Sequence, residues 1–285
     1  MKRRSANTTN KTTGKNSGKT TGKISGNIYP ILTIVGILIL WECLSKFEIV
    51  PSFMLPTPWE TVMAFVHDFG LLMSHTKVTL IETLVGTLAG ITIGFFSAVL
   101  MDRWDPAYKA MYPLIVLTQT IPAVAIAPLL VLWFGYEMAP KIILIILITY
   151  FPIVIGVLDG FRSADQDAIN LMRSMGASRW QIFRHIKFPG ALPNFFSGLR
   201  ITVAYAVVGA VLAEWLGGFA GLGVYMTRVK KSFAYDKMFA VIFLISIISL
   251  LLIWLVGVLQ KRCMPWERAD EIGESAPTTS EERVM

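Results

Sequence analysis

Long apolar runs set the strongest constraint on how this sequence folds. A helix of roughly 17 to 25 predominantly apolar residues is long enough to cross the hydrocarbon core of a bilayer. Because 54% of the 285 residues are hydrophobic and only 16% are charged, the chain is expected to be an integral membrane protein. The sequence predicts an all-α, polytopic membrane protein with six transmembrane helices, at residues 28–44, 78–101, 110–134, 141–158, 194–216 and 237–260.

The third predicted span contains three prolines, Pro113, Pro122 and Pro128. Proline lacks a backbone N–H and bends or breaks a helix, which a membrane tolerates only where neighbours or a cavity satisfy the freed backbone groups. We therefore expect this span to be broken or bent. A polar run beside the second proline gives three candidates for lining a translocation path: Thr118, Gln119 and Thr120.

The largest hydrophilic interruption covers residues 165–200, between two predicted spans. Its first part predicts a helix over Asp165–Ser174, which Gly176 breaks. A second helix is expected to begin at Ser178, whose hydroxyl can cap the N–H of Gln181 while Gln181 reaches back. The sequence thus predicts two short amphipathic helices joined at a glycine, forming a loop over about 165–190.

The second of these helices places Trp180, Phe183 and Ile186 on one face, with basic residues on the others, and is expected to end at Pro189 and Pro193. Two interpretations fit this pattern. The segment is either a compact knob that binds a partner protein or a basic amphipathic loop that lies on anionic lipid.

Two further segments are expected on the opposite surface. Thr57 as N-cap, Pro58 at the first helical position and Glu60 at the third predict a short amphipathic helix that Gly70 ends. A glycine-rich segment over 217–236 separates the last two spans.

The distribution of positive charge predicts the orientation. Of the 26 Lys and Arg residues, 19 fall on the side of the two termini and the central loop, which the positive-inside rule places in the cytoplasm. Residues 1–27 contain a near-repeat, KTTGKNSG then KTTGKISG, and are expected to form a disordered basic tail. The transmembrane domain is expected over 28–266, followed by an acidic tail at 267–285. Because the tail at 1–27 holds the whole net charge of +7, no nucleic acid is expected as a partner.

A few ionisable residues fall in or near the predicted spans. Glu214, beside Trp215, either faces the translocation path or lies at the membrane interface. Asp159 and Arg162 suggest a surface pair or loop anchors. Glu82 is expected near one end of the second span.

Enzymatic chemistry finds no support in the sequence. His67, His75 and His185 are scattered and form no metal-binding spacing. The sequence has no nucleophile motif and no nucleotide-binding motif, so we expect a non-enzyme without cofactor or metal.

Three stretches resemble the permease subunits of ATP-binding cassette (ABC) importers. GASRWQIFRHIKFPGALPNFFSGLRI is similar to the family's EAA loop, with Asn170, Leu171 and Met172 where Glu-Ala-Ala is usual. LTQTIPAVAIAPLLVLWFG and AEWLGGFAGLGVYMTRVKKSF resemble the third span and the fifth span with its outer segment. WECLSKFEIVPSFMLPTPWET completes the resemblance to the branch that imports nitrate, taurine, alkanesulfonates and thiamine precursors.

The resemblance implies a type I importer permease in the cell membrane, assembled as a homodimer with ATPase subunits inside and a solute-binding protein outside. It implies that the loop couples to the ATPase, through Gly176, Ala177, Trp180 and Phe183. The expected solute is a small polar molecule, a thiamine-precursor pyrimidine, with sulfonate, taurine or nitrate as alternatives. The rival class is a self-contained secondary transporter or channel, which more often shows an internal repeat or a buried ionisable pair, and neither is evident in the sequence.

Overall fold

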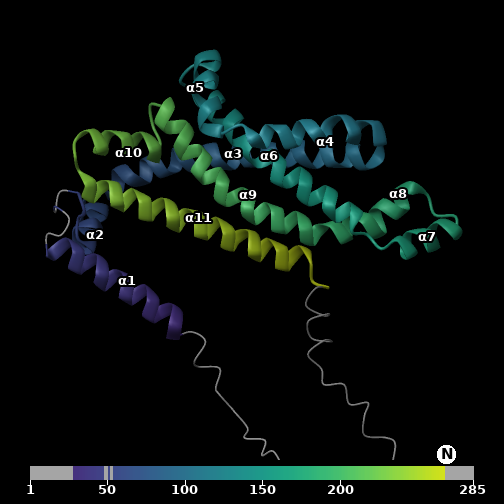
Figure 1. The fold of residues 1–285 in the computed structure, drawn as a ribbon, viewed down its shortest axis with the longest axis horizontal. Helices are drawn as coiled ribbons and strands as arrows, with labels where there is room; N and C mark the ends of the chain where they lie inside the picture. Colours follow the sequence, from purple (N-terminus) through teal and green to yellow (C-terminus); the bar gives the residue numbers. More distant parts are fainter. Residues whose placement is uncertain (1–27, 48–50, 52–53, 267–285) are drawn as a thin grey trace, which may run out of the picture.

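The computed structural model describes residues 28–47, 51 and 54–266, and within them it consists of helices without a strand. The long helices run side by side, with α7 (Gln166–Ser174) and α8 (Arg179–Ile182) at one end and α2 (Pro58–His67) and α10 (Leu222–Lys231) at the other (Figure 1). This confirms the all-α prediction. The two predicted tails, 1–27 and 267–285, lie outside the described residues.

Within the described ranges, five helices are long and apolar enough to cross a membrane, and a bent pair makes a sixth span if it is counted as one. The pair is α4 (Asp105–Thr120) and α5 (Ala123–Phe134), which meet at 97°. The break falls at Ile121 and Pro122, so the predicted interruption of the third span is confirmed. The five long helices are α1 (Ile28–Lys46), α3 (Phe69–Arg103), α6 (Met138–Arg162), α9 (Phe188–Leu216) and α11 (Tyr235–Cys263).

The core is centred on α6, which packs between α3 and α9. Glycines make the close approach possible. A Cβ added at Gly86 of α3 would lie 2.6 Å from the Cβ of Ile145 on α6, and one added at Gly160 of α6 would lie 2.6 Å from the Cα of Ala191 on α9. In a membrane, where packing rather than water exclusion holds helices together, such small residues allow the backbones to meet.

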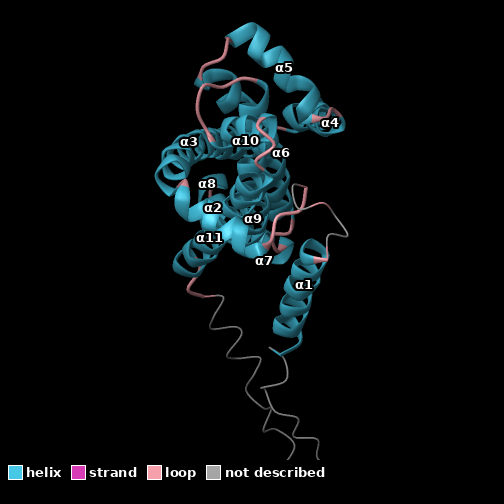
Figure 2. Ribbon diagram, turned by 90° about the vertical axis from the view of Figure 1, so that its left-hand side faces the viewer, coloured by secondary structure: helices cyan, strands magenta, loops and turns pink. Residues whose placement is uncertain are grey.

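Helix α1 lies apart from this bundle (Figures 1 and 2). Its contact with the rest is concentrated near its end. The ring of Trp41 stacks on Phe239 and Phe243 of α11, and its indole N–H donates to the carbonyl of Pro56, at 2.9 Å. Most of the remaining α1 side chains are exposed in the single chain.

The predicted end of the surface helix was wrong. Thr57 and Glu60 form the expected capping box of α2, but that helix ends at His67, and Gly70 lies inside α3. The N–H of Leu72 donates to the carbonyl of Asp68 at 2.8 Å, so a new helix starts at the corner. Span α3 therefore begins nine residues before its predicted start, at Phe69 rather than residue 78, and Glu82 lies well inside it.

The predicted stop at Pro189 and Pro193 was also wrong. A π-helical turn over Phe183–Lys187 joins α8 to α9 without a break, and both prolines lie within α9. The N–H of Phe188 donates five residues back, to the carbonyl of Phe183. In an α-helix the ring of a proline clashes with the carbonyl four residues earlier, and its missing N–H leaves that carbonyl unbonded. In the π-helical turn before Pro189 the hydrogen bonds reach five residues back, which displaces the carbonyls, so the helix continues.

Candidate translocation and coupling sites

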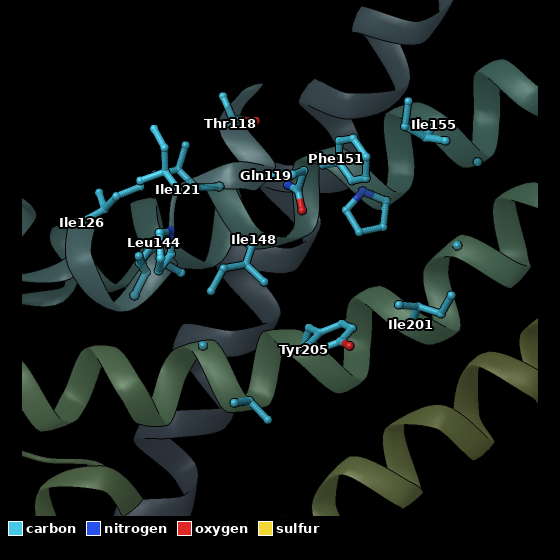
Figure 3. A pocket seen from close by; sticks show the side chains of 18 of the residues that line it. Thr118, Gln119, Ile121, Ile126, Leu144, Ile148, Phe151, Ile155, Ile201 and Tyr205 are labelled. Atoms are coloured by element: carbon cyan, nitrogen blue, oxygen red, sulfur yellow. The ribbon is translucent and has the colours of Figure 1, made fainter. Parts of the chain in front are cut away.

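A cavity of about 840 Å³ opens between the α4–α5 break, α6 and α9. Figure 3 shows the Gln119 amide of α4 and the Tyr205 ring of α9 extending toward the same space, with Ile148 of α6 between them. The lining is mostly apolar. Its polar members are Thr118, Gln119, Asp159, Asn194, Ser197 and Tyr205.

The wall on α9 is open to one side. Tyr205 keeps 57% and Ile201 53% of their surface exposed, although both line the cavity. Ser197, Ile201, Tyr205, Val208 and Leu212 recur at helical spacing along this face. The same spacing is present in the sequence, but the predicted path was drawn from polar and acidic residues alone and so omitted this face.

The sequence candidates for the translocation path separate in the structure. Thr118 and Gln119 line the cavity. Thr120 is not among the lining residues, and its hydroxyl donates to the carbonyl of Leu117 at 2.8 Å. Glu214 is 2% exposed and lies away from the lining. Asp159, which with Arg162 was predicted to form a surface pair or loop anchors, is exposed and lines the cavity, whereas Arg162 donates to the hydroxyl of Tyr108.

The knob, residues 165–187, has its own small core. Ile169 of α7 and Ile182 of α8 are buried against each other and Ala164, with Ala177 packed beside them. Gly176 has φ +82°, and the N–H of Ala177 donates to the carbonyl of Met172 at 3.0 Å. Gly176 therefore ends α7 in a left-handed turn, which glycine adopts without a Cβ penalty.

An aromatic row connects the knob to the spans. Trp180 is 66% exposed and stacks on Phe183 with ring centroids 5.6 Å apart. Phe183 in turn contacts Phe161 of α6, with centroids 5.4 Å apart. Ser178 and Gln181 form the predicted capping box of α8. The knob thus presents an aromatic side chain outward and is packed on α6 inward.

A buried polar network that was not predicted from the sequence lies at the other end of the bundle. Glu82 of α3 and Lys141 of α6 form an ion pair at 2.6 Å, with side chains at most 4% exposed. Thr79 of α3 donates to Glu214 Oε1 at 2.7 Å and accepts the N–H of Leu222 at 2.9 Å. The absence of a buried ionisable pair, inferred from the sequence, was therefore wrong.

The start of α10 is hydrogen-bonded to this network. The N–H of Gly221 donates to His75 Nδ1 at 3.0 Å, and that of Gly223 donates to Glu214 Oε2 at 2.6 Å. Gly221 has φ +124°, and any Cβ there would meet the Glu214 carboxyl. The glycine-rich segment thus contains a short helix whose first N–H groups are bound by side chains of α3 and α9.

Asp68, at the corner between α2 and α3, joins three more elements. Its carboxylate accepts from Tyr225 of α10 and Lys237 of α11, each at 2.7 Å. Burial works to raise the pKa of Asp68, but hydrogen bonds from Lys237, Tyr225 and His67 outweigh it and hold the pKa below its usual range. Burial and the hydrogen bond to Asp68 raise the pKa of Tyr225.

Comparison with known proteins agrees with this architecture. Residues 90–264 match the family model described as "Binding-protein-dependent transport system inner membrane component". A probable ABC transporter permease of Haemophilus influenzae is 38% identical over 78% of this chain and 91% of its own length. The formylaminopyrimidine transport permease ThiX of Halalkalibacterium halodurans is 35% identical over 84% and 96%.

Less similar relatives are named for taurine, aliphatic sulfonates and nitrate. Among solved structures, the methionine ABC transporter MetNI, in inward-facing conformations, superimposes with a TM-score of 0.61 at 20% identity, covering 68% of this chain and 96% of that chain. This likeness shows the fold, that of a type I importer permease. The chain therefore belongs to the binding-protein-dependent ABC transport permeases, as a multi-pass inner-membrane transport subunit rather than an enzyme.

Proposed function

We propose that this chain forms the path by which a small, uncharged polar solute, a thiamine-precursor pyrimidine, crosses the membrane. The observation that supports it is the composition of the 840 Å³ cavity. Its lining contains no Lys, Arg or His among the described residues, and its one carboxyl, Asp159, would repel an anion. Amide and hydroxyl groups on an otherwise apolar wall suit a flat heterocycle that donates and accepts hydrogen bonds.

The alternatives all carry an anionic group: an alkanesulfonate and nitrate are anions, and taurine is a zwitterion with a sulfonate. This group lacks a cationic partner in the lining. An anion transferred from water to an apolar wall needs a cation or several convergent donors. The relative named for formylaminopyrimidine has a solute of the favoured kind. Both lines support a pyrimidine over an oxyanion.

The open face of the cavity supports a homodimer. Tyr205 and Ile201 line the space yet remain more than half exposed in one chain. A second copy placed across this face would close the path between two equivalent walls. Closed symmetric dimers are the commonest arrangement of such self-complementary surfaces.

The knob is proposed to dock on the cytoplasmic ATPase, with both termini on that side of the membrane. Exposed apolar side chains at its tip, Leu171, Met175 and Trp180, offer a patch that a partner can cover. Movement of that patch would reach α6 through Phe183 and Phe161, and so the wall of the cavity. Rigid helices carrying such a motion alternate access between the two sides.

The experiment uses the complex reconstituted in liposomes with its cognate binding protein. ATP hydrolysis is measured with formylaminopyrimidine, taurine, an alkanesulfonate or nitrate outside, and uptake is measured in parallel. We expect stimulation by the pyrimidine alone. Stimulation by an anion alone would overturn the solute assignment, and uptake by the chain without any ATPase would overturn the coupling.

A further inference from the structure

Three charged side chains from three different spans meet inside the protein: Glu82 of α3, Lys141 of α6 and Glu214 of α9. They are 0%, 3% and 2% exposed. Lys141 Nζ lies 2.6 Å from Glu82 Oε1. Thr79, one turn before Glu82 on α3, donates to Glu214 Oε1 at 2.7 Å, so the Glu214 carboxyl lies beside this face of α3. These three residues, named the charged trio from here on, lie outside the lining of the 840 Å³ cavity, so solute contact does not account for them.

The charges of the trio do not balance when all three groups are ionised. Lys141 is the only Lys or Arg among the buried residues of the described chain. His75 adds no positive charge, because its Nδ1 accepts the N–H of Gly221 and a cationic ring would donate there. Arg228 of α10 is exposed and donates to the carbonyl of Phe219. Two carboxylates would therefore face one ammonium, a net negative charge in a desolvated interior.

The hydrogen bonds show where a balancing proton fits. Both oxygens of Glu214 already accept, from the hydroxyl of Thr79 and the N–H of Gly223. Glu82 Oε1 accepts from Lys141, but Glu82 Oε2 is fully buried and has no donor among the described residues. A proton on this oxygen, directed at the Glu214 carboxylate, gives the orphaned atom a partner and makes the trio neutral.

We propose that Glu82 and Glu214 hold one proton between them, carried on Glu82 Oε2. The glycine-rich segment packs on the neutral trio, since Gly218 lies against the Lys141 ammonium and Gly221 lies against Glu214. Leu144, one turn beyond Lys141 on α6, lines the cavity. The bound proton thus keeps one end of the cavity wall in its shape, whichever solute is transported.

Two variants of equal charge and size test the position of the proton. Glu82→Gln supplies an N–H₂ donor where the proton lay and keeps an oxygen for Lys141. Glu214→Gln leaves the same net charge, but its N–H₂ group must face either the Gly223 N–H, a second donor, or Thr79 Oγ1, which already accepts the N–H of Leu222 and would have to turn its own proton away. We expect Glu82→Gln to keep the wild-type melting temperature of the purified full-length complex and Glu214→Gln to lower it. Any other order, including equal behaviour of the two variants, overturns the assignment.

Infrared spectroscopy detects the proton directly, without relying on stability. The wild-type complex at neutral pH should show the C=O stretch of a buried carboxylic acid, and Glu82→Gln should lose it. Glu42→Gln, at an exposed ion pair with Lys46, is the control that should retain the band. A wild-type spectrum without this band would show that both carboxyls are ionised and refute the proposal. This readout is independent of transport, so it also separates failure here from failure of the proposed function.

Discussion

Lys187 Nζ lies 2.7 Å from Asp102 Oδ1 and 2.9 Å from Asp102 Oδ2, so the π-helical turn at the base of the knob is tied to the end of α3. The pair joins residues 85 positions apart in the sequence. The contact of Phe183 with Phe161 ties the same turn to α6. Movement of the knob therefore reaches both α3 and α6.

We expect Asp102→Asn to weaken coupling more than it weakens folding. The two side chains are 25% and 17% exposed, so the pair is partly screened and contributes about 0.5–1 kcal/mol to stability. The measurement is solute-stimulated ATP hydrolysis of the reconstituted complex, which should fall while the melting temperature changes little. Glu42→Gln, which breaks the surface pair with Lys46 on α1, should leave hydrolysis unchanged. Equal hydrolysis in both variants would contradict a role for this tie.

Gln119→Leu should impair uptake without affecting assembly. The side chain lines the cavity, and loss of one hydrogen bond to a solute or to cavity water is worth about 0.5–1.5 kcal/mol, or roughly a two- to tenfold decrease at limiting solute. Thr33→Val is the control, because Thr33 is exposed on α1 and its hydroxyl donates to the carbonyl of Tyr29 in the same helix. Uptake that matches wild type at limiting solute would remove Gln119 from the path.

We expect the stability contributed by the Asp68 carboxylate to be lost at acidic pH. Its folded pKa lies below the usual value, so the stabilisation is complete above the unfolded carboxyl pKa of about 4 and disappears as the pH falls toward the folded pKa. Asp68→Asn should melt earlier than wild type at neutral pH, with the gap narrowing on acidification below pH ~4. Asp105→Asn, at an exposed helix start, is the comparison. A gap that stays constant with pH would contradict the ionic role of Asp68.

Gly221→Ala tests the packing of the start of α10 against Glu214. The residue has φ +124° and its missing Cβ would meet the Glu214 carboxyl, so even the smallest side chain must displace the segment. Overpacking of this kind costs about 1–3 kcal/mol. Gly257→Ala, where a Cβ meets nothing within 4 Å, should instead be neutral or stabilising. The two melting temperatures are compared in detergent, and a Gly221→Ala variant as stable as Gly257→Ala would show that the segment is not held against Glu214.

Local sequence signals predicted local structure well. The capping boxes at Thr57 and Ser178 and the break at Pro122 depend on residues within a few positions, and each is confirmed. The charged trio was not predicted because Glu82 and Lys141 are 59 residues apart, and the sequence around one residue does not indicate that it pairs with the other. The predicted helix end at Pro189 was wrong because proline disfavours the interior of an α-helix but fits after a π-helical turn. The residue types alone do not show which of the two turns precedes the proline.

The final prediction concerns Gly176, whose φ of +82° is the feature that turns the chain between α7 and α8. A Cβ at this position meets nothing within 4 Å, so a substitution acts on the backbone and not through a clash. Valine at positive φ costs about 1–3 kcal/mol and would open the turn. Gly176→Val should therefore insert normally but lose solute-stimulated ATP hydrolysis and uptake together.

A Gly176→Asn variant shows whether the effect of Gly176→Val comes from the backbone conformation or from the loss of glycine itself, because asparagine adopts positive φ at low cost. Gly176→Asn should retain most of the coupling that Gly176→Val loses. Gly190→Val, in the first turn of α9 and also facing open space, controls for adding a branched side chain near the knob. Uptake and hydrolysis are measured on reconstituted complexes with equal membrane levels checked by blot. Normal coupling in Gly176→Val would contradict docking through this turn and favour a loop that lies on lipid, since a lipid-facing loop has no fixed shape to lose.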